Sequence, residues 1–184
     1  ANGTATAGSD YVAVVGQVVT FAPGETSKPL VVTINGDTAV EADETLLVNL
    51  TNATGATIAT AQGTGTIVND DALVTVSPSA SLSFGSRFVG EPASAPQTVT
   101  FTASGAAATI TSVALGGASP SDFVISAPTT CVVGLVLAAG QSCTVSIRFQ
   151  PTLVGARSAT LLVGTNSTSG TVTVALAGGG APVN

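Results

Sequence analysis

The chain has 184 residues, of which 45% are apolar, 4% are aromatic and only 8% are charged, and its formal net charge is −6. This length suffices for one large domain or for two β-sandwiches of about 100 residues each. The absence of histidine excludes Ser-His-Asp and Cys-His catalysis and the usual zinc and copper sites, and an acidic chain without a basic stripe is unsuited to binding nucleic acid.

The first part of the chain predicts short β-strands. Glycine, proline, threonine and serine are abundant, which is typical of strands and turns. Apolar residues alternate with polar ones, so each strand presents one apolar face, and turn-forming residues separate the strands. The expected strands in this part are 17–21, 28–35, 44–50 and 65–68.

After Asp71 the expected strands become longer and acidic residues almost disappear. They are 72–76, 81–84, 97–103, 109–115, 122–126, 142–149, 158–164 and 171–176. Short strands at regular spacing, with turn signals between them, indicate an all-β sandwich. The glycine-rich end, 178–184, predicts a flexible linker. No stretch of 18 apolar residues is present that could form a membrane span.

Acidic side chains are concentrated before residue 72. Residues 1–71 hold eight acids and one base, Lys28, which gives a net charge of −7, whereas residues 72–184 have a net charge of +1. Seven of these acids lie in three places. They are Asp10, then Asp37, Glu41, Asp43 and Glu44, then Asp70 and Asp71.

These acids predict a calcium site. If neighbouring strands run antiparallel, all three places lie at the same end of a sandwich, unless Gly16 turns a hairpin and moves Asp10 to the other end. Packed carboxylates repel one another, and Ca²⁺ takes about six to eight oxygen ligands, whereas Mg²⁺ demands a stricter octahedron. The alternative interpretation is that the acids are exposed loop residues that promote solubility.

Four segments in order resemble the Calx-β domain. They are GTAxAGSDY at 3–11, VTFxPGET at 19–26, DxxxExDET at 37–45 and GTIxNDD at 65–71. The resemblance implies an Ig-like sandwich that binds Ca²⁺ at one loop end, with Asp43 beside the ion or facing solvent. Gly36 and Asn69 stand where calcium-binding members often carry aspartate, which implies fewer ions or weaker binding. The ligands implied are Asp10, Asp37, Glu41, Glu44, Asp70 and Asp71.

Family members carry one or two further strands before the segment that matches 3–11. The first sandwich is therefore expected to be incomplete at its N-terminal edge. A sandwich without its edge strand exposes backbone groups and part of its core. Self-association, with a strand donated by a neighbouring chain, would cover them. The alternative is that these strands lie upstream in a longer polypeptide, of which this chain is a fragment.

Residues 72–180 resemble bacterial Ig-like modules of the choice-of-anchor D group, related to hydin-type domains. The resemblance rests on LxFG at 82–85, LxxGxxCxVxIxFxP at 137–151 and GxRxAxL at 155–161. Cys131 and Cys143 are expected to form a disulfide, which places the chain in an oxidising compartment; the alternative is a pair of reduced, buried thiols. Arg148 and Arg157 are expected to be solvent-exposed.

We therefore expect two tandem Ig-like β-sandwiches, at 1–71 and 72–180, followed by a tail at 181–184. The expected function is that of a non-enzymatic, extracellular structural or adhesive module of a bacterial surface protein or filament, stabilised by Ca²⁺ and associating with itself or with other domains of a larger surface protein. The alternative is a calcium-responsive regulatory or ligand-recognition module of a larger secreted protein.

Overall fold

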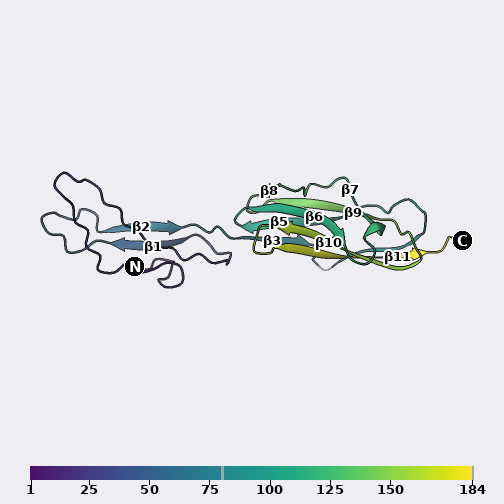
Figure 1. The fold of residues 1–184 in the computed structure, drawn as a ribbon, viewed down its shortest axis with the longest axis horizontal. Helices are drawn as coiled ribbons and strands as arrows, with labels where there is room; N and C mark the ends of the chain where they lie inside the picture. Colours follow the sequence, from purple (N-terminus) through teal and green to yellow (C-terminus); the bar gives the residue numbers. More distant parts are fainter. Residues whose placement is uncertain (80, 184) are drawn as a thin grey trace. The chain divides into compact units, whose positions relative to one another are not determined.

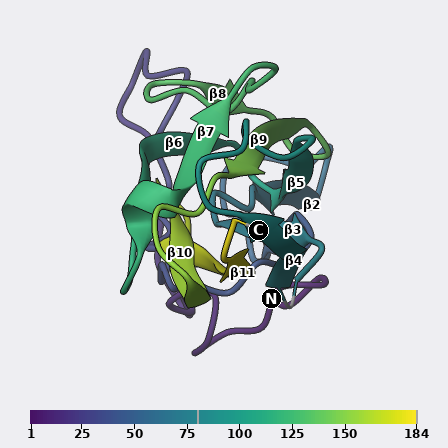
Figure 2. The same ribbon diagram turned by 90° about the vertical axis from the view of Figure 1, so that its right-hand side faces the viewer.

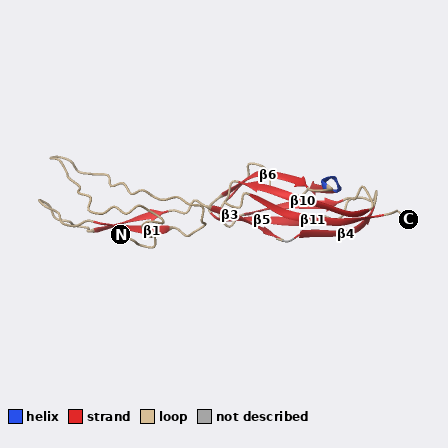
Figure 3. Ribbon diagram, turned by 60° about the horizontal axis from the view of Figure 1, so that its bottom comes forward, coloured by secondary structure: helices blue, strands red, loops and turns tan. Residues whose placement is uncertain are grey.

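The computed structural model describes residues 1–79 and 81–183, and it confirms the all-β fold class. The chain forms two compact units, Ala1–Asn69 and Asp70–Asn184, which are described separately below. Strands make up most of the second unit, and loops make up most of the first (Figure 3). Within the described residues, no helix is long and apolar enough to cross a membrane.

The second unit is a sandwich of two β-sheets (Figures 1 and 2). All strand pairs are antiparallel except β4 with β11. The five-stranded sheet has the order β4 (Ser81–Phe88), β11 (Thr171–Ala181), β10 (Gly155–Thr165), β6 (Ala108–Gly116) and β8 (Val136–Leu137). The four-stranded sheet has the order β3 (Ala72–Ser77), β5 (Gln97–Gly105), β9 (Ser142–Phe149) and β7 (Phe123–Ser126).

The core of this unit follows the alternation in the sequence. On β9, Cys143, Val145, Ile147 and Phe149 are all buried, as the period-two pattern predicts. The Phe149 ring lies 4.9 Å from that of Phe123, centroid to centroid. All eight strands expected in this unit are present, and only the two-residue strand β8 was not expected.

The predicted flexible linker at 178–184 is wrong for its first residues, because Gly178, Gly179 and Gly180 belong to β11. All three are paired with β10 on one side, and Gly179 and Gly180 are also paired with β4 on the other. A Cβ atom on Gly178 would lie 2.5 Å from the Phe149 ring, and one on Gly180 would lie 2.0 Å from the Leu153 carbonyl oxygen. Glycine is therefore used here for close packing within a strand, not for chain flexibility.

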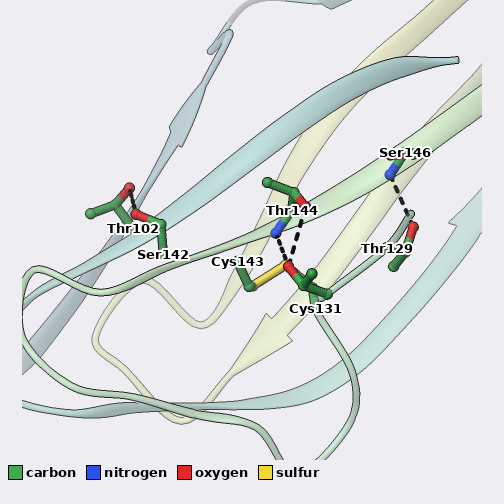
Figure 4. Close-up of a disulfide and its surroundings, with 8 residues drawn as sticks. Thr102, Thr129, Cys131, Ser142, Cys143, Thr144 and Ser146 are labelled. Carbon is green, nitrogen blue, oxygen red and sulfur yellow. Dashed lines mark hydrogen bonds between the residues drawn. A yellow bond between two sulfur atoms is a disulfide. The ribbon is translucent and has the colours of Figure 1, made fainter. Parts of the chain in front are cut away.

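The structure contains the disulfide between Cys131 and Cys143, with a Cα–Cα distance of 4.9 Å (Figure 4). Both cysteines are buried in the core. The disulfide ties the segment after β7 to β9, and hydrogen bonds on either side reinforce the connection: the Thr144 N–H donates to Thr130 Oγ1 at 2.8 Å, and the Ser146 N–H donates to Thr129 Oγ1 at 3.0 Å. The long segment between β7 and β8 is thereby fixed to the sheet.

Arg157 is not the exposed residue that the sequence suggests, because it pairs with the fully buried Asp122. Asp122 closes the 3-10 turn η1 (Pro120–Asp122) and also accepts hydrogen bonds from the N–H and hydroxyl groups of Thr152, at 3.0 and 2.6 Å. Burial acts to raise the pKa of Asp122, but the hydrogen bonds from Thr152 and Arg157 outweigh it, so the pKa lies below its usual value. Arg148 is half-buried and donates to the Ser94 carbonyl oxygen at 3.1 Å.

The first unit has one two-stranded antiparallel sheet, made of β1 (Glu44–Asn49) and β2 (Gln62–Ile67). Isolated bridges join Asn2 to Leu46 and Tyr11 to Ile34. A small core forms where Ala5, Tyr11 and Leu46 meet, and the Tyr11 hydroxyl donates to Asn2 Oδ1 at 2.8 Å. The N-terminal segment therefore packs beside β1.

Two strands expected in this unit, 17–21 and 28–35, do not form, apart from the single bridge at Ile34. The expected inward residues Val19, Phe21 and Ile34 are 40%, 53% and 45% exposed. Alternation predicts which face of a strand is apolar, but a strand also needs a neighbour for its backbone hydrogen bonds. Among the described residues, 17–21 has no such neighbour, and 28–35 has one only at its end, where residues 10–12 bond to 33–35.

Replacing Gly178 with alanine is expected to destabilise the second unit by about 1–3 kcal/mol, because the new methyl group would overlap the Phe149 ring. The measurement is the thermal transition of this unit by calorimetry. Gly179→Ala is the matched control, since its methyl group would approach only the Ser86 hydroxyl, at 3.0 Å. Equal losses in the two variants would contradict the packing role.

Removing the Asp122 carboxylate is expected to cost about 3–5 kcal/mol, because Asp122→Ala leaves the Arg157 guanidinium without its buried partner. In the wild type, a carboxyl whose pKa is lowered in the folded state stabilises it above the unfolded pKa of about 3.9, and this contribution is lost as the pH falls through the lower folded value. Denaturation of both proteins at pH 7 and pH 2 tests this. Glu91→Ala, which removes a partly exposed ion pair with Arg87, should cost less than about 1 kcal/mol.

Candidate metal centre

Asp10 lies in a tight loop that holds its carboxylate in place. The Thr6 N–H donates to Asp10 Oδ2 at 2.6 Å, and the Asp10 N–H donates back to the Thr6 carbonyl oxygen at 3.0 Å. The Thr6 N–H foremost, and then the Ser9 hydroxyl, lower the pKa of Asp10. Asp10 is therefore held as a carboxylate.

Backbone hydrogen bonds bring this loop to the start of β1 and to the turn that carries Asp37. The Ala5 N–H donates to the Thr45 carbonyl oxygen at 2.9 Å, next to Glu44. The Asn35 N–H donates to the Asp10 carbonyl oxygen at 3.0 Å. Segments that are 25 and 40 residues apart in the sequence are thus brought together in the first unit.

Glu44, the first residue of β1, is half-buried and lies among other acids. Its pKa is raised, first by desolvation, then by the negative charge of Asp10 and a hydrogen bond shared with it, and then by the charges of Glu41 and Asp37. The structure therefore brings four of the six predicted ligands, Asp10, Asp37, Glu41 and Glu44, near enough to act on one another electrostatically.

Asn69 has a role that sequence reasoning missed. Its N–H donates to Asp43 Oδ1 at 3.0 Å, and its Oδ1 accepts the Glu41 N–H at 3.2 Å. It therefore fastens the acidic loop to the end of β2, and Asp43 is engaged in that contact. The signal was the hairpin register: Glu44 pairs with Ile67, which places residue 69 opposite residue 42, between the two acids that it holds.

Asp70 and Asp71, the remaining predicted ligands, belong to the second unit. The Asp71 carbonyl oxygen accepts the Ala106 N–H at 2.9 Å, which ties it to the loop between β5 and β6. Their participation in the site remains a prediction.

The donor chemistry of the four gathered side chains fits Ca²⁺, because every candidate ligand is a hard carboxylate oxygen. The backbone also supplies oxygens in the adjoining loops. Among the described residues, however, no three acidic side chains converge closely enough to enclose a metal ion. The first unit thus gathers carboxylates of the kind that bind Ca²⁺. Among its described residues, they do not form a closed coordination shell.

The comparison with protein families agrees with the resemblance of the first part. Residues 1–75 match the family model of the Calx-beta domain. The match ends there, so the likeness of residues 72–180 to choice-of-anchor D modules remains a prediction. Among proteins with curated descriptions, none matches the chain significantly.

Three solved structures illustrate the similarity of the chain to known folds. The VesB protease of Vibrio cholerae is 20% identical with a TM-score of 0.45, over 58% of this chain and 31% of that one. The secreted serine protease VesC from the same organism is 27% identical with a TM-score of 0.40, over 53% of this chain and 21% of that one. The PapD-like domain 7 of human CEP192 is 16% identical with a TM-score of 0.42, over 60% of this chain and 87% of that one. The chain thus matches about a third or less of the length of either protease.

Neutralising Glu44 is expected to stabilise the metal-free first unit, because Glu44→Gln removes a charge that is disfavoured first by desolvation and then by the negative charge of Asp10. A carboxyl whose pKa is raised on folding destabilises the folded state when it is ionised. The advantage of the variant should therefore be present at neutral pH and disappear as the pH falls through the raised pKa towards the ordinary value of 4.5. Thermal unfolding in chelator, from pH 8 to pH 4, measures it.

Glu25→Gln is the control, because the pKa of Glu25 is lowered whereas that of Glu44 is raised. Lys28, 2.5 Å away, and the Ala22 N–H lower the pKa of Glu25, so its neutralisation should destabilise the unit or leave it unchanged. If Glu44→Gln also lowered the melting temperature at pH 7, the repulsion inferred at this end of the unit would be refuted.

Proposed function

We propose that this chain is a non-enzymatic, extracellular structural or adhesive module of a bacterial surface protein, whose first unit is stabilised by Ca²⁺. Asp10, Asp37, Glu41 and Glu44 would hold the ion, with Asp70 and Asp71 as further predicted ligands. The bound cation would supply positive charge to a cluster that has no basic residue of its own. The proposal thus concerns stability and assembly, not chemistry on a substrate.

The observation that carries the proposal is that backbone hydrogen bonds, from Ala5 to Thr45 and from Asn35 to Asp10, bring acidic segments together. The pKa of Glu44, raised by desolvation and then by the charge of Asp10, agrees with this. Two carboxylates brought together by backbone contacts impose an electrostatic cost on the folded unit. A divalent cation would turn this cost into a favourable interaction, whereas acids that only promote solubility have no need to gather. The Calx-beta match over residues 1–75 supports the same interpretation.

The extracellular location is supported by the disulfide between Cys131 and Cys143, since such bonds persist mainly in oxidising compartments. A structural role is supported by the construction of the second unit. Its hydrophobic core is continuous between the two sheets. Its buried Asp122 forms an ion pair with Arg157 within the same unit. The bacterial setting rests on the resemblance of residues 72–180 to choice-of-anchor D modules.

Calcium is expected to raise the stability of the first unit, by about 2.7 kcal/mol when its concentration is a hundred times the dissociation constant. Calorimetry of the whole chain in calcium and in chelator should show the shift in one transition and leave the other, assigned to the second unit by the Gly178→Ala variant, unchanged. Asp10→Asn and Asp37→Asn should each remove most of the calcium effect.

Glu25→Gln serves as the matched control, because it removes one carboxylate of the same unit outside the cluster, and the calcium effect should survive it. The proposal fails if calcium leaves the wild type unchanged. A dissociation constant in the micromolar range, with a change in structure on binding, would instead favour the alternative of a calcium-responsive regulatory module.

A further inference from the structure

Two asparagines of the first unit are each followed by glycine: Asn2 by Gly3, and Asn35 by Gly36. In such a pair the backbone nitrogen of the glycine can attack the side-chain amide carbon of the asparagine, because glycine has no Cβ to hinder the approach and its backbone turns freely. Asparagine is among the thermolabile residues of proteins. The two pairs have the same covalent chemistry, so their surroundings in the fold decide which of them reacts.

The fold holds the Asn2 pair in place. Asn2 Oδ1 accepts hydrogen bonds from the Ala7 N–H at 2.9 Å and from the Tyr11 hydroxyl at 2.8 Å. The Asn2 backbone also lies in an isolated bridge with β1. Gly3 packs so closely on β1 that a Cβ atom added to it would lie 2.5 Å from the Thr45 carbonyl oxygen. The side-chain amide and the glycine nitrogen therefore cannot turn towards each other without breaking these contacts.

The Asn35 pair is held on one side and open on the other. The Asn35 N–H donates to the Asp10 carbonyl oxygen at 3.0 Å, which fixes the backbone that enters the pair. The side-chain amide makes an exposed hydrogen bond from Nδ2 to the Gly8 carbonyl oxygen, at 3.2 Å. Gly36 is exposed, and beyond its chain neighbours a Cβ atom added to it would meet no described atom within 4 Å. The Gly36 nitrogen therefore has room to approach the Asn35 side chain.

We propose that Asn35 is a site of spontaneous deamidation, and that it reacts in the folded protein while Asn2 does not. The Gly36 nitrogen loses its proton and bonds to Asn35 Cγ, the bond from Cγ to the side-chain nitrogen breaks, and ammonia leaves with that proton. Water then opens the cyclic imide. Cleavage of the new bond gives aspartate, and cleavage of the original peptide bond gives isoaspartate, in which the backbone runs through the former side chain. Overall, one water is consumed and one ammonia is released.

The product changes the region where Asp10 and Asp37 lie. A carboxylate at position 35 has no donor for the Gly8 carbonyl oxygen, so the present hydrogen bond is lost and two oxygens face each other. The reaction also places a negative charge in the turn that carries Asp37, next to the loop of Asp10. Like charges brought together raise the free energy of the folded state. Deamidation is therefore expected to destabilise the metal-free first unit as the protein ages.

Incubation of the whole chain in chelator, followed by peptide mass spectrometry, tests the proposal. The peptide that contains Asn35 should convert to aspartate and isoaspartate several-fold faster than the peptide that contains Asn2. The rate should rise from pH 6 to pH 8, because the attacking nitrogen must lose its proton. In urea, where neither pair is held, the two peptides should react at similar rates. Equal rates in the folded protein, or an Asn35 peptide that reacts in urea but not in the folded chain, would overturn the proposal.

Gly36→Ala tests the attacking residue. A Cβ atom has room there and Gly36 has no positive φ, so the variant should fold like the wild type, while conversion of Asn35 should slow several-fold. An unchanged rate would contradict attack by this nitrogen.

Asn35→Asp imitates the aspartate product and tests its effect on stability. In chelator it should lower the melting temperature of the first unit more than Asn35→Ser, which loses the same hydrogen bond without adding a charge. Added salt should reduce the difference between the two variants, because it screens the repulsion. Equal melting temperatures of the two variants at low salt would refute the charge effect. All these measurements are made in chelator, so their outcome does not depend on the calcium site.

Discussion

The backbone's need for hydrogen-bond partners separates the two units of this chain. In the second unit, two sheets satisfy that need so fully that even Gly178, Gly179 and Gly180 are held in β11. In the first unit, among the described residues, β1, β2, isolated bridges and loop hydrogen bonds meet the same need, whereas residues 13–21 make no backbone hydrogen bond. One sequence composition therefore gives a closed sandwich in the second unit and a structure built mostly of loops in the first.

Scarcity of charge is the second constraint, because a chain with few ionised groups has few opposite charges to pair them with. Asp122 is buried, but Arg157 neutralises its charge and Thr152 donates hydrogen bonds to it. Its carboxylate therefore contributes to the stability of the second unit. Asp10 and Glu44 are brought together without a cation of their own. Asp10 and Glu44 thus differ from Asp122, which has a positively charged partner in Arg157.

The alternation of apolar and polar residues predicted the strands of the second unit. It could not predict features that need a partner distant in the sequence. All eight strands expected after Asp71 are present, because alternation there coincides with neighbours on both sides. The strands expected at 17–21 and 28–35 show the same alternation but have no neighbour along their length, so the pattern alone was not enough. Strand direction does not explain why Asp10, Asp37, Glu41 and Glu44 lie near one another, because the strands 17–21 and 28–35 on which that expectation depends do not form. Backbone hydrogen bonds between loops, from Ala5 to Thr45 and from Asn35 to Asp10, bring them together instead. The tethering role of Asn69 needed the hairpin register, and the pairing of Arg157 with Asp122 joins residues 35 positions apart for which local spacing gives no signal.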